Sequence, residues 1–144
     1  MAENSVTISL PSCSAAIDRI DPELAHQLVG QISVGLGALA VLAPSATARA
    51  FGITAGTTAA PLLVRMVGVR NATAGVRTLQ AQGSDLTRAL QAGFVLGVVD
   101  TAAVLLAARK GLISKKAAVG ALILFGGIAV LGVAASRDPG RRRG

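Results

Sequence analysis

The sequence predicts an all-α integral membrane protein that folds as an antiparallel four-helix bundle. Apolar residues make up 52% of its 144 residues, and Ala, Val, Leu and Gly supply most of them. Four apolar stretches each approach the roughly 20 residues that a helix needs to cross a bilayer. The connections between them are too short for a soluble domain, and two are tight enough to make neighbouring helices antiparallel.

The composition also excludes several classes of protein. The chain has three Phe and no Trp or Tyr, whereas a soluble core normally uses more aromatic residues and a larger charged surface. Small apolar residues suit membrane helices, although the usual interfacial belt of Trp and Tyr is missing. The 14 Lys and Arg exceed the 7 Asp and Glu, but they are scattered or lie at helix ends. We therefore expect a lipid bilayer as the partner, and no nucleic acid.

The first domain boundary falls near residue 20. Residues 1–20 are polar and Ser-rich, which predicts a flexible tail. Cys13 is the single cysteine, so no disulfide can form within the chain. The residues before it lack the basic start and apolar run of a signal peptide, so we expect no lipidation there.

A transmembrane domain is predicted over residues 21–136, and its first helix over about 24–43. Asp21 can cap this helix, and Pro22 fits its first position. His26 lies in the first turn, where we expect it to be interfacial and solvated. Pro44 ends the helix, and residues 44–51 can form a short interfacial helix.

Three further spans are predicted over about 61–81, 86–108 and 117–135, followed by a basic tail over 137–144. Ser84 or Asp85 can cap the third span, and Ser114 can cap the fourth. Gly93 and Gly97 have the spacing of a close helix contact, which we expect to pack within the subunit.

The second span carries the polar residues that need an explanation. Arg65, Arg70 and Asn71 lie within it, and a charge deep in a bilayer costs about 2.5–3.5 kcal/mol or more. If the second and third spans form a hairpin, Asp100 lies level with position 67. Helical side chains lean towards their own N-terminus, which brings Arg70 closer to this depth and takes Arg65 away from it. We therefore predict that Arg70 pairs with Asp100, while Arg65 extends to the nearer interface.

This polar site allows two interpretations. In the first, the ion pair lets the helices insert and fixes their register, which is a structural role. In the second, Arg65, Arg70, Asn71 and Asp100 form a pocket that binds an anionic or hydrogen-bonding ligand, or relays protons. A buried ion pair contributes little to stability by itself, so the sequence leaves both interpretations open.

The residues around this site also resemble a known family. The pattern Arg-x-x-Gly-x-Arg-Asn-x-x-x-Gly over 65–75, with the segment 48–52 before it, is similar to small bacterial four-helix membrane proteins classed as domain of unknown function 4267. The resemblance covers about residues 28–135. Members usually carry Asp where this chain has Asn71, which removes a second acid from the site. The resemblance implies a fold and no established activity.

The leading hypothesis for function is a non-enzymatic scaffold or accessory subunit, with no cofactor and no metal. The chain offers no Ser/His/Asp set, no Cys pair and no metal cluster. The alternatives are a small transporter or a lipid- or quinone-binding protein that uses Arg65, Arg70 and Asp100, and a membrane enzyme with Asp100 as acid or base. A membrane protein partner or a second copy of the chain fits any of these. We expect the protein in the inner (plasma) membrane with cytoplasmic termini, because Lys and Arg are slightly more frequent on that side.

Overall fold

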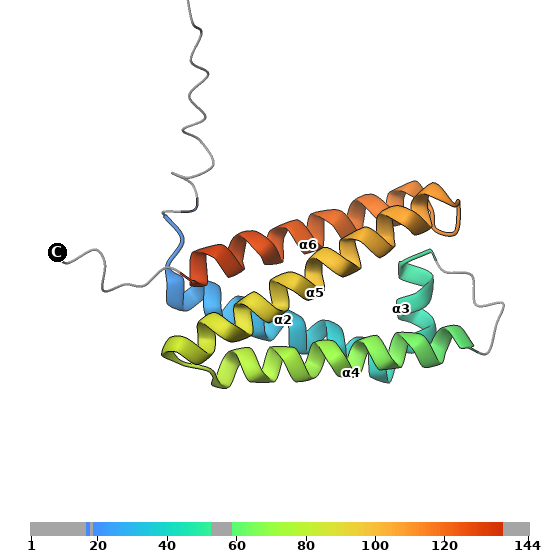
Figure 1. The fold of residues 1–144 in the computed structure, drawn as a ribbon. Helices are drawn as coiled ribbons and strands as arrows, with labels where there is room; N and C mark the ends of the chain where they lie inside the picture. Colours follow the sequence, from blue (N-terminus) through green and yellow to red (C-terminus); the bar gives the residue numbers. More distant parts are fainter. Residues whose placement is uncertain (1–16, 18, 53–58, 137–144) are drawn as a thin grey trace, which may run out of the picture.

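All regular structure in the described part of the chain is helical. The computed structural model describes residues 17, 19–52 and 59–136. Its helices are α2 (Pro22–Leu42), α3 (Pro44–Ala50), α4 (Ala59–Gln80), α5 (Gly83–Arg109) and α6 (Lys115–Ala135). The four long helices lie side by side and alternate in direction, and the short α3 lies between α2 and α4 in the chain (Figure 1). This agrees with the predicted all-α class.

The helices lie where the sequence predicted them, but they differ in how apolar they are. Three of them, α2, α5 and α6, are long and apolar enough to cross a membrane. The fourth long helix, α4, has 22 residues but is not among these three, because its arginines lower its hydropathy. The count of four spans therefore stays a prediction. The predicted tails over 1–20 and 137–144 fall almost entirely outside the described residues, as does Cys13.

Polar caps fix where α2 and α6 begin. The Asp21 carboxylate accepts hydrogen bonds from the backbone N–H groups of Glu23 and Leu24, at 2.8 and 3.1 Å. The Ser114 hydroxyl accepts one from the Ala117 N–H at 3.2 Å. Both satisfy donors that a helix start leaves without an intrahelical partner, as predicted.

The start of α5 differs from the prediction. Gln82 occupies the N-cap position of α5 and makes no side-chain capping bond, so capping by Ser84 or Asp85 is wrong. Gly83 instead makes the turn with a φ of 55°, a conformation that glycine adopts without strain. The connection from α4 to α5 therefore depends on backbone geometry and not on a polar cap.

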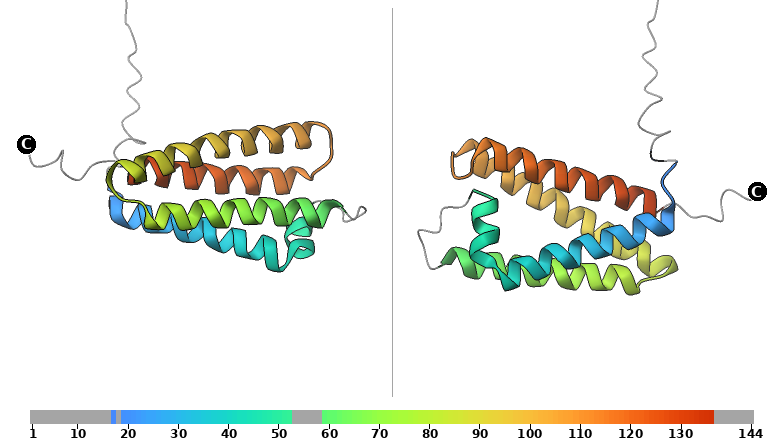
Figure 2. Two further views of the ribbon diagram at one scale, coloured as in Figure 1. Left: turned by 60° about the horizontal axis from the view of Figure 1, so that its bottom comes forward. Right: turned by 180° about the vertical axis from the view of Figure 1, so that it is seen from behind.

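The closest packing among the described helices joins α2 to α4, which run antiparallel side by side (Figure 2). Glycines of the two helices face each other. A Cβ added at Gly68 would lie 2.8 Å from the Gly37 carbonyl oxygen, and one added at Gly75 would lie 2.7 Å from the Gly30 carbonyl oxygen. Real side chains do not come this close. The two backbones touch because each helix has glycines seven residues apart on one face.

A small hydrophobic cluster closes the end of the molecule where the described chain begins and ends. It consists of buried residues from three helices: Ala25, Val29, Leu90, Ala134 and Ala135. Ile17 and Ile20 pack against it. Ile17 and Ile20, at the end of the segment predicted as a tail, therefore bury part of their apolar surface in this cluster.

His26 is buried in this structure and not solvated as predicted. Its Nε2 lies 2.6 Å from the carbonyl oxygen of Thr78, in the last turn of α4. A carbonyl can only accept, so Nε2 carries the proton and donates it. The last carbonyls of a helix lack regular intrahelical donors, and the Thr78 carbonyl otherwise accepts only a longer bond, 3.3 Å, from the Ala81 N–H. His26 of α2 thus supplies a donor to the end of α4, which explains why it is drawn into the interface.

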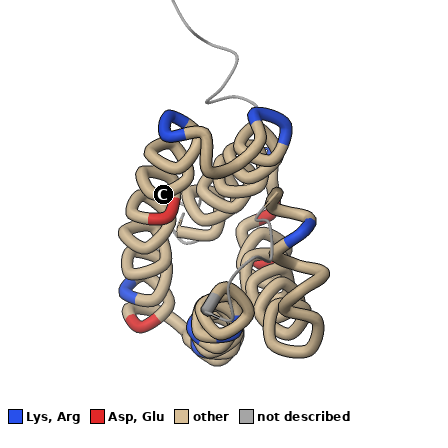
Figure 3. Tube along the Cα trace, turned by 90° about the vertical axis from the view of Figure 1, so that its right-hand side faces the viewer, with Lys and Arg blue, Asp and Glu red and all other residues tan. Residues whose placement is uncertain are grey.

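The outer faces of α5 and α6 are not covered by any other described part of the chain. Large apolar side chains are exposed along both helices: Phe94, Val95, Val98, Val99, Leu105 and Leu106 on α5, and Val119, Ile123, Val130 and Val133 on α6. A Cβ added at Gly93 or Gly97 would meet nothing within 4 Å, so the predicted close contact within the subunit is wrong. Figure 3 shows the four long helices almost end-on, with Lys and Arg on the turns at the near end.

Candidate polar site between α4 and α5

The centre of the candidate site is an ion pair between α4 and α5. Arg70 Nη2 donates to Asp100 Oδ2 at 2.5 Å. The two residues lie level because α4 and α5 form an antiparallel hairpin around the turn at residues 81–82. This confirms the pairing that the depth argument predicted for Arg70.

The pair is only partly enclosed. The exposed fraction is 34% for the Arg70 side chain and 26% for the Asp100 side chain. Arg70 Nη2 also donates to Asn71 Oδ1 at 3.3 Å, so three of the four predicted site residues lie together. Arg70 Nε is buried and has no hydrogen-bond partner among the described residues. A buried donor without an acceptor is unfavourable, so this side of the guanidinium favours an added acceptor.

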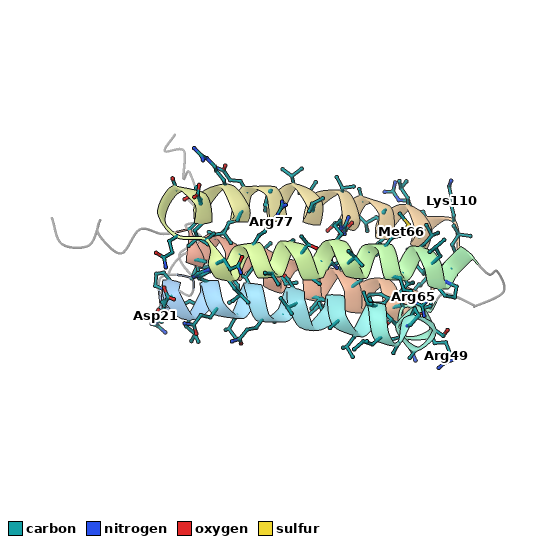
Figure 4. All side chains as sticks on the ribbon, turned by 90° about the horizontal axis from the view of Figure 1, so that it is seen from below. Asp21, Arg49, Arg65, Met66, Arg77 and Lys110 are labelled. Carbon is teal, nitrogen blue, oxygen red and sulfur yellow. The ribbon has the colours of Figure 1, made fainter. Side chains whose placement is uncertain are left out.

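Arg65 does not join the other three residues. It is exposed on α4 and makes no ion pair within the described part of the chain. Five residues turn a helix by about 500°, so Arg65 and Arg70 point about 140° apart. Figure 4 places Arg65 near the Arg49 end of the molecule, whereas Arg77 lies nearer the Asp21 end. Arg70, Asn71 and Asp100 therefore form one site, and Arg65 lies outside it.

A cleft of about 600 Å³ opens beside Arg70, between the last turns of α4 and the first turns of α5. Three arginines line it, Arg70, Arg77 and Arg88, together with one carboxylate, Asp85. Its remaining wall is made of small or apolar residues and Thr73: Thr73, Ala74, Ala81, Ala89, Ala92, Gly93 and Leu96. The Thr73 hydroxyl donates to the Val69 carbonyl of its own helix at 2.8 Å. The cleft is thus basic near the turn and apolar along α5.

Sequence reasoning missed the contribution of Arg77 and Arg88 to this site. Arg77 is seven residues after Arg70, so both lie on one face of α4. Arg88 is near the start of α5, and its carboxylate partner Asp85 lies 3.2 Å away. A hairpin places the residues that flank its turn on neighbouring helices. The positions of Arg77 and Arg88 on either side of the turn at Gly83 could therefore have predicted that both arginines lie at this site.

A smaller hollow of about 380 Å³ lies at the opposite end of the molecule. Arg49 in the last turn of α3 and Phe51 at its C-cap line it, together with Ser114 and Lys116 at the start of α6. The end of α3 and the start of α6 therefore lie together at this end of the molecule. The hollow is separate from Arg70 and Asp100, because no residue lines both openings.

The arrangement supports electrostatic binding more than catalysis. Among the described residues, no group of three or more His, Cys, Asp and Glu lies together in a way that could hold a metal ion. Asp100 is engaged by Arg70, which orients its carboxylate. The remaining positive charge of the cleft comes from Arg77 and Arg88.

Comparison with protein-family models, with curated proteins and with solved structures found no match for this chain. The resemblance to the small four-helix membrane family stays a prediction.

Proposed function

We propose that this protein is a non-enzymatic, multi-pass protein of the inner (plasma) membrane, a small scaffold or accessory subunit built as an antiparallel four-helix bundle. Its Arg70–Asp100 pair has a structural role in this proposal, since it neutralises the most central charge of α4 and holds α4 against α5.

The exposed apolar surface of α5 and α6 is the observation that supports the proposed membrane location. Within the most apolar 18-residue window of α5, only 6% of the residues are buried in the protein, and the corresponding figure for α6 is 17%. Apolar surface on this scale is not left in water by a monomeric soluble protein. A bilayer covers it without any further protein contact.

The charges on α4 are compatible with a fourth span. Arg70 is paired with Asp100, which removes the charge nearest the middle of the helix. Arg77 is three residues from the end of α4, or about 4.5 Å, and Arg65 is six residues from its start, or about 9 Å. Long side chains at these depths can reach a headgroup region. The arginines therefore lower the hydropathy of α4 without forbidding insertion.

Ligand binding remains a second candidate function, and the cleft beside Arg70 favours it. A ligand site formed by Arg65, Arg70 and Asp100 together is less favoured, because Arg65 lies apart from the other two residues. A ligand that used this cleft would meet Arg70, Arg77 and Arg88 instead.

Two measurements test the membrane proposal. The full chain should stay with membranes after extraction with alkaline carbonate, which removes peripheral proteins. Reporter fusions at the N- and C-termini should both report the cytoplasm, because four spans return the chain to its starting side. Release by carbonate would overturn membrane insertion, and opposite compartments for the two termini would overturn the count of four.

A further inference from the structure

We propose that the cleft between α4 and α5 binds the headgroup of an anionic phospholipid, with Arg77 and Arg88 on the phosphate and one acyl chain along the small residues of α5. This inference rests on the proposed membrane location. It names a ligand class for residues outside the Arg70–Asp100 pair.

The charge of the cleft favours an anion. Of its three arginines, Arg70 is neutralised by Asp100. Arg77 has no ion pair or side-chain hydrogen bond within the described residues. An arginine within three residues of a helix end, next to an apolar cleft, is stabilised when a phosphate supplies the countercharge.

Arg88 is also available to a ligand, although it has a partner. Its pair with Asp85 joins two side chains that are 77% and 74% exposed. Exposed pairs of this kind contribute about 0–1 kcal/mol, so a phosphate can take over the guanidinium at little loss. Arg88 and Arg77 then hold the headgroup from neighbouring helices, with the turn at Gly83 between them.

The shape of the cleft distinguishes a lipid from a free anion. Beyond the two arginines, the wall along α5 consists of Ala89, Ala92, Gly93 and Leu96. Nothing lies within 4 Å of a Cβ added at Gly93, so the small residues leave room beside the helix. A volume of about 600 Å³ exceeds the space that a phosphate group needs, and it admits the first part of an acyl chain. Arg70 also lines the cleft, and its Nε has no hydrogen-bond partner among the described residues.

The test uses the full chain in nanodiscs that contain phosphatidylcholine and phosphatidylglycerol, followed by native mass spectrometry of the retained lipids. The intact protein should retain phosphatidylglycerol in preference to phosphatidylcholine. Arg77→Gln and Arg88→Gln should each lower the retained phosphatidylglycerol about five-fold, because each removes a charge-assisted contact with the bound phosphate. Arg109→Gln, which removes an exposed arginine outside the cleft, is the matched control and should leave retention unchanged.

A second pair of variants tests the acyl-chain groove without changing charge. Gly93→Leu fills the apolar wall and should lower retention of phosphatidylglycerol several-fold. Gly126→Leu is its control, since Gly126 is also open to space but lies on α6 outside the cleft. If Gly93→Leu left the retention of phosphatidylglycerol unchanged, or if Gly126→Leu lowered it equally, the proposal that an acyl chain lies along α5 would be wrong.

Competition with inorganic phosphate separates the lipid from a free anion. Millimolar phosphate at constant ionic strength should leave the lipid bound, because phosphate lacks the acyl chain. Full displacement by phosphate would overturn the lipid assignment. If the chain stays in membranes but Arg77→Gln, Arg88→Gln and Arg109→Gln behave alike, the cleft inference fails and the membrane proposal stands. Release of the chain by carbonate would overturn both.

Discussion

The α2–α4 pair and the α5–α6 pair use small residues in opposite ways. In α2 and α4, glycines face each other and the two backbones come into contact. In α5 and α6, the glycines at 93, 97, 120, 126, 127 and 132 have no close neighbour. A third of the residues in the apolar window of α2 are buried, against 6% for α5. Glycine in a membrane-type helix therefore does not by itself mark a contact; the neighbouring helix must present a matching face.

This difference has a physical reason in α4. Arg65, Arg70 and Arg77 make α4 the least apolar of the long helices. Contact with lipid is therefore less favourable for α4 than for the other three long helices. Close packing on α2 shields one side of its backbone, and the ion pair with Asp100 of α5 neutralises its central charge. Apart from Asp100, which is paired with Arg70, the charges of α5 and α6 lie near the helix ends, so their long apolar middle parts can be covered by lipid alone.

The largest expected effect comes from Gly37→Ala. The added methyl would overlap the backbone nitrogen of Ala72, so the two helices must separate. Overpacking of this kind typically costs 1–3 kcal/mol, and we expect about 3 kcal/mol because backbone atoms cannot move aside. Thermal unfolding in detergent, followed by circular dichroism, measures the loss.

Gly97→Ala is the control for this experiment. Its methyl meets nothing within 4 Å, and alanine favours a helix over glycine by up to about 1 kcal/mol. We expect an unchanged or slightly raised melting temperature. Equal losses in the two variants would show that the α2–α4 contact is no tighter than the surface of α5.

The next largest effect is expected from Asp100→Asn. Removing one partner of a fully buried ion pair costs about 3–5 kcal/mol. The pair here is partly exposed, so we expect about 2 kcal/mol, near the range of hydrogen bonds to charged groups. Thermal stability of Asp100→Asn, Arg70→Gln and the double variant forms a double-mutant cycle. The double variant should lose less than the sum of the single changes.

Arg65→Gln supplies the comparison for this cycle. Arg65 makes no contact with Asp100, so its effect should add to that of Asp100→Asn without coupling. Strict additivity for Arg70, or coupling for Arg65, would mean that α4 and α5 are not joined through this pair.

Much of this architecture follows from local sequence signals, and the rest depends on how helices meet. The hydrophobic runs, the caps at Asp21 and Ser114, and the pairing of Arg70 with Asp100 could be predicted, because each depends on one helix or one hairpin. The spacing of Gly93 and Gly97 was misleading, since four-residue spacing is common in Gly-rich chains. A seven-residue spacing occurs in α2, α4 and α6, and it corresponds to a close contact only in α2 and α4, where the two glycine faces meet.

Other features could not be predicted because they depend on contacts between distant segments. The burial of His26 depends on the last turn of α4, 52 residues away in the sequence. The basic cleft depends on how far apart α4 and α5 lie near their turn, which hydrophobic patterning does not specify.

His26→Ala tests the polar end of the α2–α4 interface and should have a moderate effect. The change removes the donor to the Thr78 carbonyl and leaves a cavity, so we expect a loss of about 1–2 kcal/mol. His26→Gln keeps a side-chain donor and should recover part of this loss. The same melting experiment measures both variants. A melting temperature that His26→Ala leaves unchanged would show that the end of α4 does not need this donor.

The smallest effect on stability is expected from Arg88→Gln, and it sharpens the comparison most. Its pair with Asp85 is exposed on both sides, and exposed pairs one turn apart contribute at most about 0.5 kcal/mol. The melting temperature of lipid-free protein should therefore barely change, although retention of phosphatidylglycerol should fall about five-fold. Arg70→Gln, by contrast, should lower the stability even without lipid, because it breaks the pair with Asp100. If Arg88→Gln destabilised the lipid-free protein as much as Arg70→Gln did, the basic rim of the cleft would belong to the structural site, and α4 and α5 would depend on Arg88 for their contact.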